Sequence, residues 1–214
     1  MGIPQGSPLS PILFLFFISE LLDDLSRADE GVLAFGFVDD TNLVAWGDTA
    51  RNNCLRLGQV HDRCIAWAKR HGARFSPDKY KLIHFTRQRR RTDDLASSIR
   101  AGDHPVKPEA EIRVLGVWVD SKLQWKEHVK RATSKGAAAY EAMSRITAST
   151  WGPSMKRSRL IYAATVRPVL LYGAATWAVK DNGEPAAESL IRPLKQVQRT
   201  SAYEGWPAHT NAHP

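Results

Sequence analysis

The sequence predicts an α+β fold, in which a mixed region of helices and strands is followed by helices alone. Two observations favour this class. Up to residue 120 the hydrophobic pattern alternates between the periods of a helix and of a strand, and from Ser121 onward only the helical period remains. We therefore expect a first domain over residues 1–119, a helical region over 120–178 and a divergent tail over 179–214. At 214 residues and 43% hydrophobic composition, the chain is long enough for a domain and an appendage.

The first expected element is a helix. Ser10 and Pro11 form a good cap and first turn, and the apolar spacing continues through Leu25. Its first half, ILFLFFI at residues 12–18, is apolar nearly all round, so we expect a helix buried inside a core. The run is too short to cross a bilayer, and acidic residues follow it closely. No membrane partner is therefore expected.

Two short strands and a second helix follow. Residues 32–38 and 41–46 predict a β-hairpin, and Asp48 or Thr49 would cap a helix that ends near Gly72. Apolar residues recur on this helix at steps of three and four, which predicts a buried stripe. The stripe consists of Ala50, Cys54, Leu57, His61, Cys64, Ile65 and Ala68. We interpret the histidine as a core residue, and the two cysteines, which form no CxxC pair, as reduced core thiols of an intracellular protein.

The later elements are irregular at first and then helical. Residues 74–86 alternate like a strand after a proline turn, the polar residues 93–109 predict a loop, and residues 112–120 predict one last strand. Three helices are expected beyond them, at residues 121–147, 153–177 and 186–203.

Charge is unevenly distributed along the chain. The net charge is +8, but residues 1–60 contain three Arg and eight Asp or Glu, a net charge of −5, so the remaining residues carry +13. An acidic focus followed by a basic body is what a metal-assisted enzyme acting on nucleic acid needs. Solvated faces rich in lysine and arginine would give the same composition.

Two adjacent aspartates, Asp39 and Asp40, lie at the tip of the predicted hairpin, where Asn-Gly or Asp-Gly is usual. Like charges so close together require compensation, which a divalent cation supplies. Carboxylate oxygens suit Mg²⁺ or Mn²⁺, and Mg²⁺ is usually held by one or two carboxylates together with substrate phosphates. We therefore expect two-metal phosphoryl transfer here, with a turn of two solvated acids as the alternative.

Four blocks lie in a distinctive order around these aspartates: GIPQGSPLSPILFLFF at residues 2–17, FVDD at 37–40, FSPDKYKLIHF at 75–85 and LGVWVDSKLQWKEHV at 115–129. Over residues 2–178 the chain resembles the palm and thumb of reverse transcriptases of the non-LTR retrotransposon type, most closely those of fungal genomes. The resemblance implies a partial polymerase palm followed by an all-helical, thumb-like appendage. It also implies RNA-templated extension of a DNA primer with deoxynucleoside triphosphates and Mg²⁺ or Mn²⁺.

The resemblance implies roles for several residues of the palm. Asp39 and Asp40 correspond to two of the three catalytic, metal-binding carboxylates, and Phe37 would pack beside the primer end. Lys79, or alternatively Lys81, would protonate or neutralise the leaving pyrophosphate. A surface lysine in a strand turn would give the same pattern.

Two glycine-containing segments complete the expected contacts. The loop of Pro4, Gln5 and Gly6 would contact the template base and the incoming nucleotide, since glycine permits close backbone approach and glutamine offers an amide. The second segment resembles the primer-grip hairpin and consists of Leu115, Gly116 and Val117.

In the helical part, RPVLLYGAATW at residues 167–177 resembles the thumb, which holds the template–primer duplex mainly through phosphates. The basic run RQRRR at residues 87–91 would touch RNA, act as a nuclear address or form a solvated loop. Our candidates for contacts to the nucleic-acid backbone lie at helical spacing: Lys126, Lys130, Arg131 and Lys135.

The resemblance also implies what this sequence lacks. In relatives the fingers and a third metal-binding aspartate precede the first block, so we expect a truncated fragment that is inactive alone. Its exposed palm surface would favour self-association. Two alternatives stay open, a non-catalytic nucleic-acid-binding remnant and an organellar intron maturase-like protein. A nuclear location is expected, with the mitochondrion as the other candidate.

Overall fold

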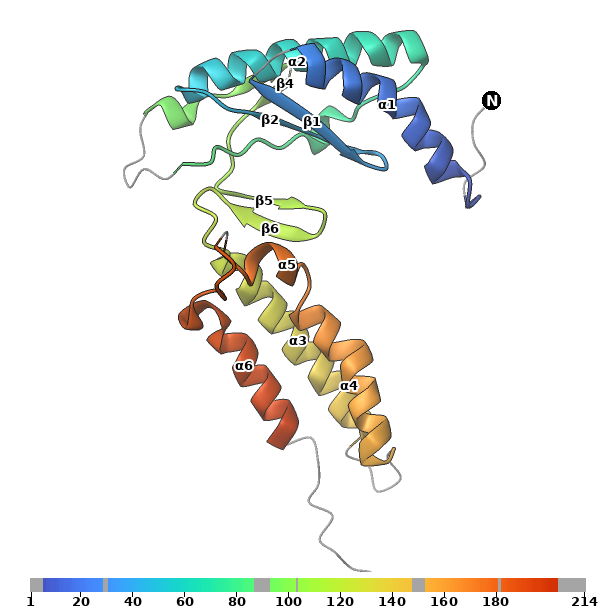
Figure 1. The fold of residues 1–214 in the computed structure, drawn as a ribbon, viewed down its shortest axis with the longest axis vertical. Coiled ribbons are helices and arrows are strands. Elements are labelled where there is room, and N and C mark those ends of the chain that lie inside the picture. The colour runs from blue at the N-terminus through green and yellow to red at the C-terminus, as the bar shows by residue number, and fades with distance from the viewer. Residues whose placement is uncertain are drawn as a thin grey trace, which may run out of the picture. The chain divides into compact units, whose positions relative to one another are not determined.

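The computed structural model describes residues 6–28, 31–86, 93–102, 104–147, 153–180 and 182–203. The chain divides into two compact units, Met1–Ala110 and Glu111–Pro214 (Figure 1). The division lies earlier in the chain than the domain boundary expected at residue 119, because the last β-hairpin contacts the helices that follow it. Among the described residues, no helix is both long enough and apolar enough to span a membrane.

The first unit is built on two helices and a hairpin. Its main elements are α1 (Ser10–Ala28), β1 (Val32–Phe37), β2 (Asp40–Ala45) and α2 (Ala50–His71). The two strands are antiparallel, with Val32 opposite Ala45 and Phe37 opposite Asp40. This confirms the predicted order of helix, hairpin and helix. Both helices lie on the same side of the hairpin in Figure 1, and their shared core consists of Ile18, Leu21, Leu25, Val32, Ala34, Val60, Cys64, Trp67 and Ala68.

The first half of α1 is not buried, so that part of the prediction is wrong. Phe16 is 74% exposed, and Ile12 and Leu13 are each 50% exposed. One stripe of the helix, which includes Phe14 and Ile18, packs on the core. A helix that is apolar on all sides need not be packed on all sides. Among the described residues, only one stripe of α1 packs on the core.

The hairpin likewise has one packed and one open face. Val32 and Ala34 are buried, whereas Leu33 and Phe35 are exposed. Residues directly opposite each other in an antiparallel pair share a face, so Val44, opposite Leu33, belongs to the open one. The first unit therefore exposes an apolar sheet face. Self-association through an exposed surface stays a prediction.

The start of α2 is fixed by two capping groups. The Thr49 side chain accepts a hydrogen bond from Asn52 N at 3.2 Å, which confirms one of the two predicted caps. The carboxylate of Asp94 accepts from Ala50 N at 2.6 Å and from Arg51 N at 3.0 Å. Asp94 lies in η2 (Asp93–Ala96), within a region predicted as loop, and ties it to the helix start. Sequence reasoning missed this long-range cap because no local pattern marks it.

On α2 the predicted stripe is largely correct. Cys54, Cys64 and Ala68 are buried, and the side chain of His61 is only 14% exposed and lies 3.2 Å from the Tyr80 hydroxyl. Ile65 departs from the prediction, because it is 42% exposed.

The rest of the first unit differs from the sequence prediction. Residues 74–86 are not a strand: they contain a short 3-10 helix, η1 (Pro77–Lys79), and one bridge between Leu82 and Pro108. The proline fixes its own φ and starts the helical turn. The predicted loop at residues 93–109 instead contains β3 (Ile99–Ala101) and β4 (His104–Val106), a short antiparallel hairpin.

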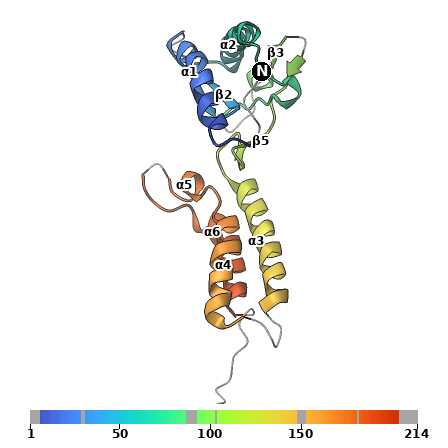
Figure 2. The same cartoon turned by 90° about the vertical axis from the view of Figure 1, so that its right-hand side faces the viewer.

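The second unit joins a hairpin to helices. It contains β5 (Glu111–Val114), β6 (Val117–Asp120), α3 (Lys126–Thr147), α4 (Met155–Leu170), α5 (Ala174–Trp177) and α6 (Glu188–Tyr203). Figure 2 shows α3, α4 and α6 running alongside one another, and their apolar faces form one core around Val129, Tyr140 and Val166.

Three predictions in this unit need correction. The single strand at 112–120 is a hairpin, because Leu115 and Gly116 both have positive φ, 47° and 88°, and turn the chain back. The helix predicted from Ser121 begins at Lys126, since the Asp120 carboxylate accepts hydrogen bonds from the intervening backbone. The helix predicted over 153–177 is interrupted by Gly173, whose φ is 65°.

Gly58→Ala and Gly136→Ala make the same change in two helices and should have opposite effects. A Cβ at Gly58 of α2 would meet nothing within 4 Å, so alanine should stabilise the first unit by about 0.5–1 kcal/mol through helix propensity. A Cβ at Gly136 of α3 would overlap the Leu170 side chain, so alanine should cost roughly 1–3 kcal/mol there. Urea unfolding monitored by tryptophan fluorescence measures both changes. A stabilising Gly136→Ala would contradict the described packing of α3 on α4.

Candidate active site

The tip of the β1–β2 hairpin carries the adjacent aspartates. The pair Phe37–Asp40 closes a two-residue turn made by Val38 and Asp39. Val38 has a φ of 54°, a left-handed conformation that is unusual for a β-branched residue and normally belongs to glycine in such turns. Both aspartates are exposed. The turn therefore keeps a strained residue while it presents two carboxylates to solvent.

Phe37 and Asp40 share the open face of the hairpin, because they are paired. Phe37 is 60% exposed. Further along this face, Asn42 has a buried Nδ2 atom without a hydrogen-bond partner in the described part of the chain. The face around Asp40 thus combines exposed aromatic surface, a carboxylate and an unsatisfied donor.

The donor set at this tip suits a hard divalent cation, but it is small. Two exposed carboxylates are what Mg²⁺ or Mn²⁺ takes from a protein when phosphates and water supply the other ligands. Within the described ranges, however, no three side chains of His, Cys, Asp or Glu come together in a group that could hold a metal ion. The residues present therefore fit a partial metal site.

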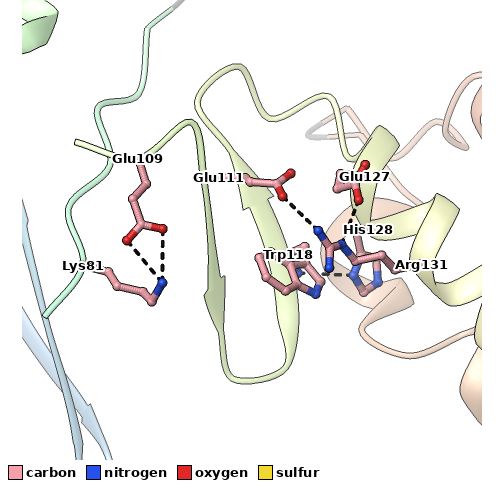
Figure 3. A network of polar contacts seen from close by, with 7 residues as sticks. All are labelled: Lys81, Glu109, Glu111, Trp118, Glu127, His128 and Arg131. Atoms are coloured by element: carbon pink, nitrogen blue, oxygen red, sulfur yellow. Dashed lines mark hydrogen bonds and ion pairs between the residues drawn. The ribbon is translucent and has the colours of Figure 1, made fainter. Parts of the chain in front are cut away.

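The other palm candidates are placed as follows. Lys79 ends η1, is exposed, and has no hydrogen bond or ion pair to another described side chain. Lys81 instead pairs with Glu109, its Nζ lying 3.1 Å from Oε2 (Figure 3). Gly6 is exposed with a φ of 91°, whereas Pro4 and Gln5 lie outside the described residues. The basic run at 87–91 lies outside them as well.

The basic candidates on α3 fall into two groups. Lys126, Lys130 and Lys135 are exposed, and no described residue forms an ion pair with them. Arg131 is engaged: its Nε lies 2.8 Å from Glu127 Oε1, and its Nη2 lies 3.0 Å from Glu111 Oε1.

The same guanidinium stacks on the Trp118 ring, with Cζ 3.9 Å from the ring centroid (Figure 3). Arg131 thus joins β5, β6 and α3 inside the second unit. Two carboxylates already balance its charge, which makes it a poorer candidate for a phosphate than the three lysines.

The cysteines do not contribute a nucleophile. Cys54 and Cys64 are both free and buried, which confirms their prediction as core thiols. Burial raises the pKa of the Cys64 thiol to about 11, and burial followed by the nearby Asp94 charge raises the pKa of Cys54. At neutral pH both therefore stay protonated and unreactive.

Comparison with known proteins defines the class. A family model described as reverse transcriptase (RNA-dependent DNA polymerase) matches residues 1–119. Because the match covers more than half of the chain, the chain belongs to the reverse transcriptase family. The family predicted from the four sequence blocks is thereby confirmed.

Individual relatives give the type. A Retrovirus-related Pol polyprotein from type-1 retrotransposable element R1 of Bradysia coprophila is 24% identical over 181 residues, 82% of this chain and 17% of the relative. A second R1 polyprotein, from Nasonia vitripennis, is 26% identical over 179 residues, 82% of this chain and 43% of the relative. The RNA-directed DNA polymerase from mobile element jockey of Drosophila melanogaster is 23% identical over 200 residues, 92% of this chain and 21% of the relative.

These relatives are non-LTR retrotransposon polymerases, so the predicted type is confirmed at low identity. The expected likeness to fungal elements stays a prediction. The chain spans less than half the length of each of these three relatives. No solved structure matches the chain.

The raised pKa of Cys64 predicts a pH dependence of stability. An unfolded thiol ionises near pH 9.0, while the folded thiol stays protonated until about 11. The free energy of unfolding should therefore be fully retained below pH 9 and decline as pH rises to about 11. Urea unfolding of the wild type and of Cys64→Ala across this range measures the effect of the thiol together with its charge on Tyr80, since groups that do not interact with Cys64 cancel in the difference. A difference that does not change with pH would contradict it.

Proposed function

We propose that this chain supplies the metal-binding hairpin and the duplex-binding helices of an RNA-directed DNA polymerase, which extends a DNA primer on an RNA template with deoxynucleoside triphosphates. The observation that carries the proposal is the position of Asp39 and Asp40. Both aspartates lie within the family-matched residues 1–119, at the exposed tip of a tight hairpin. Val38, which directly precedes Asp39 in the turn, has a strained backbone conformation. Strain of this kind persists at functional sites, where the surrounding structure holds it.

The chemistry assigned to this tip is metal-assisted nucleotidyl transfer. Asp39 and Asp40 would bind Mg²⁺ or Mn²⁺, which activates the attacking oxygen and neutralises the leaving group when bound. Phe37, on the same open face as Asp40, would pack beside the primer end. Lys79 is the better of the two lysine candidates for the leaving pyrophosphate, since Lys81 is paired with Glu109.

The second unit would hold the template–primer duplex. Lys126, Lys130 and Lys135 lie along α3, and their exposed side chains are suited to bind phosphates. Phosphate contacts supply most of the affinity in such complexes. The turn at Leu115 and Gly116, whose Leu115 side chain is 44% exposed, would contact the primer strand. In this assignment the first unit is the palm and the helical unit is the thumb.

We also propose that a third carboxylate comes from outside the described residues. Two carboxylates hold a divalent ion weakly, and the described part of the chain offers no further acidic group beside them. With Asp39 and Asp40 as the only metal-binding carboxylates, primer extension should be poor. A non-catalytic role, in which only the basic helices act, is the competing hypothesis and is favoured by the charge of +13 beyond residue 60.

The test is primer extension on an RNA template with Mg²⁺, with and without an added upstream palm segment from the R1 relative of Bradysia coprophila. Replacing Asp39→Ala/Asp40→Ala should reduce extension at least 100-fold, because removal of metal-binding carboxylates abolishes charge stabilisation. The matched control is Asp23→Ala/Asp24→Ala, an adjacent exposed pair on α1. It should retain full extension.

Extension that requires Asp39 and Asp40 supports the polymerase proposal, whether or not the added segment is needed. Extension that survives their replacement would overturn it. No extension in any arm, together with salt-sensitive duplex binding equal in wild type and double variant, would favour the binding remnant instead.

A further inference from the structure

The segment RPVLLYGAATW carries a tyrosine that contacts the β5–β6 turn. Tyr172 follows the end of α4, and its hydroxyl donates a hydrogen bond to the carbonyl oxygen of Leu115 at 2.8 Å. The two residues are 57 positions apart in the chain. The contact therefore joins the β5–β6 turn to the C-terminal end of α4, and not to residues close to the turn in the sequence.

Two glycines allow this close approach. A Cβ at Gly116 would lie 2.6 Å from the Tyr172 hydroxyl oxygen and 2.9 Å from its Cε1 atom. A Cβ at Gly173 would lie 2.7 Å from Val117 Cγ2. Gly116 of the turn thus faces the Tyr172 ring, and Gly173 faces the Val117 side chain. Both glycines also have positive φ, which other residues adopt at a cost.

The backbone of Tyr172 is also fixed by hydrogen bonds. Its carbonyl oxygen accepts hydrogen bonds from Trp177 Nε1 at 2.9 Å and from His128 Nε2 at 3.1 Å. The other ring nitrogen of His128, Nδ1, accepts from Trp118 N at 3.3 Å. These partners assign the neutral tautomer with the proton on Nε2.

His128 and Trp177 are 4% and 3% exposed, so the arrangement is locked by packing. A continuous path of hydrogen bonds therefore runs from the β6 backbone through His128 to Tyr172. Arg131 adds a separate tie through Glu111 and the Trp118 ring (Figure 3).

We propose that Tyr172 is a positioning residue for polymerisation, which holds the Leu115–Gly116 turn on α3 and α4 so that turn and helices act on the duplex as one rigid body. This inference rests on the proposed function, in which the turn approaches the primer. Tyr172 is itself 51% exposed, so its hydroxyl contributes little to the core. Loss of the Tyr172 hydroxyl should displace the turn without unfolding the second unit.

The experiment compares Tyr172→Phe with Tyr162→Phe in the full chain, in the extension assay with the upstream segment. Both changes remove one hydroxyl from the second unit, but the Tyr162 ring packs against the α3–α4–α6 core instead of against the turn. Tyr172→Phe should lower kcat about tenfold, because small misplacements of reacting groups are costly, while KM for the duplex stays unchanged. Tyr162→Phe should leave kcat unchanged.

A second readout needs no catalysis. A primer–template duplex with a photoreactive nucleotide near the primer 3′ end is cross-linked to the chain, and peptides from residues 111–120 are quantified. Tyr172→Phe should reduce this yield several-fold at equal duplex affinity, and Tyr162→Phe should not.

The outcomes separate the two proposals. If wild-type chain binds duplex but does not cross-link at residues 111–120, the primer contact in the proposed function is wrong, and the inference falls with it. If wild type and Tyr172→Phe cross-link equally with equal kcat, the role of Tyr172 alone is overturned. A loss shared equally by both tyrosine variants would mean a general effect on stability and would also overturn it.

Discussion

The packing of the β1–β2 hairpin against α1 and α2 determines where the carboxylates of Asp39 and Asp40 lie. Val32 and Ala34 are buried in this contact, and alternation along the strand then places Phe37 on the opposite, open face. Since Phe37 pairs with Asp40, the register that buries Val32 also exposes Asp40. A slip of one residue would exchange the two faces along the whole strand. Strand register, rather than any contact of the aspartates themselves, therefore defines the site.

The β1–β2 and β5–β6 hairpins contain a similar local strain. Each closes with a two-residue turn, and each turn places a branched aliphatic residue at positive φ, Val38 at 54° and Leu115 at 47°. Glycine at either position would relieve the strain. In the second hairpin, the Tyr172 hydroxyl bonds the carbonyl of the strained Leu115 itself, so the helical unit holds the turn at that residue. In the first, paired strands on a packed core hold Val38. The strained turns coincide with the two places assigned to the primer.

Local patterns predicted the elements that depend on local physics. The hydrophobic periods of α1, the hairpin and α2 were sufficient, and residue type alone limited the cap of α2 to Asp48 or Thr49, of which Thr49 is correct. The errors concern long-range partners. Residues 12–18 are helical as expected, but their exposure depends on what packs beside them. Residues 74–86 alternate like a strand, yet a strand needs a neighbour, and in the described structure this segment forms a single bridge at Leu82. Asp39 and Asp40 could be named as candidate site residues from the sequence, because two adjacent like charges at a hairpin tip depart from the usual turn residues.

The residues on α3 show what spacing alone cannot resolve. Lys130 and Arg131 are neighbours in the sequence and carry the same charge, but only the arginine lies beside Glu111, Glu127 and the Trp118 ring. A planar guanidinium can bind two carboxylates and stack on an aromatic face at once, whereas an ammonium acts as a point charge. The arginine therefore suits the joint between hairpin and helix, and the lysines stay available for phosphates. The sequence alone does not separate these two groups of basic residues. In the structure Arg131 holds the turn in place, while the lysines are the ones that we propose for the duplex.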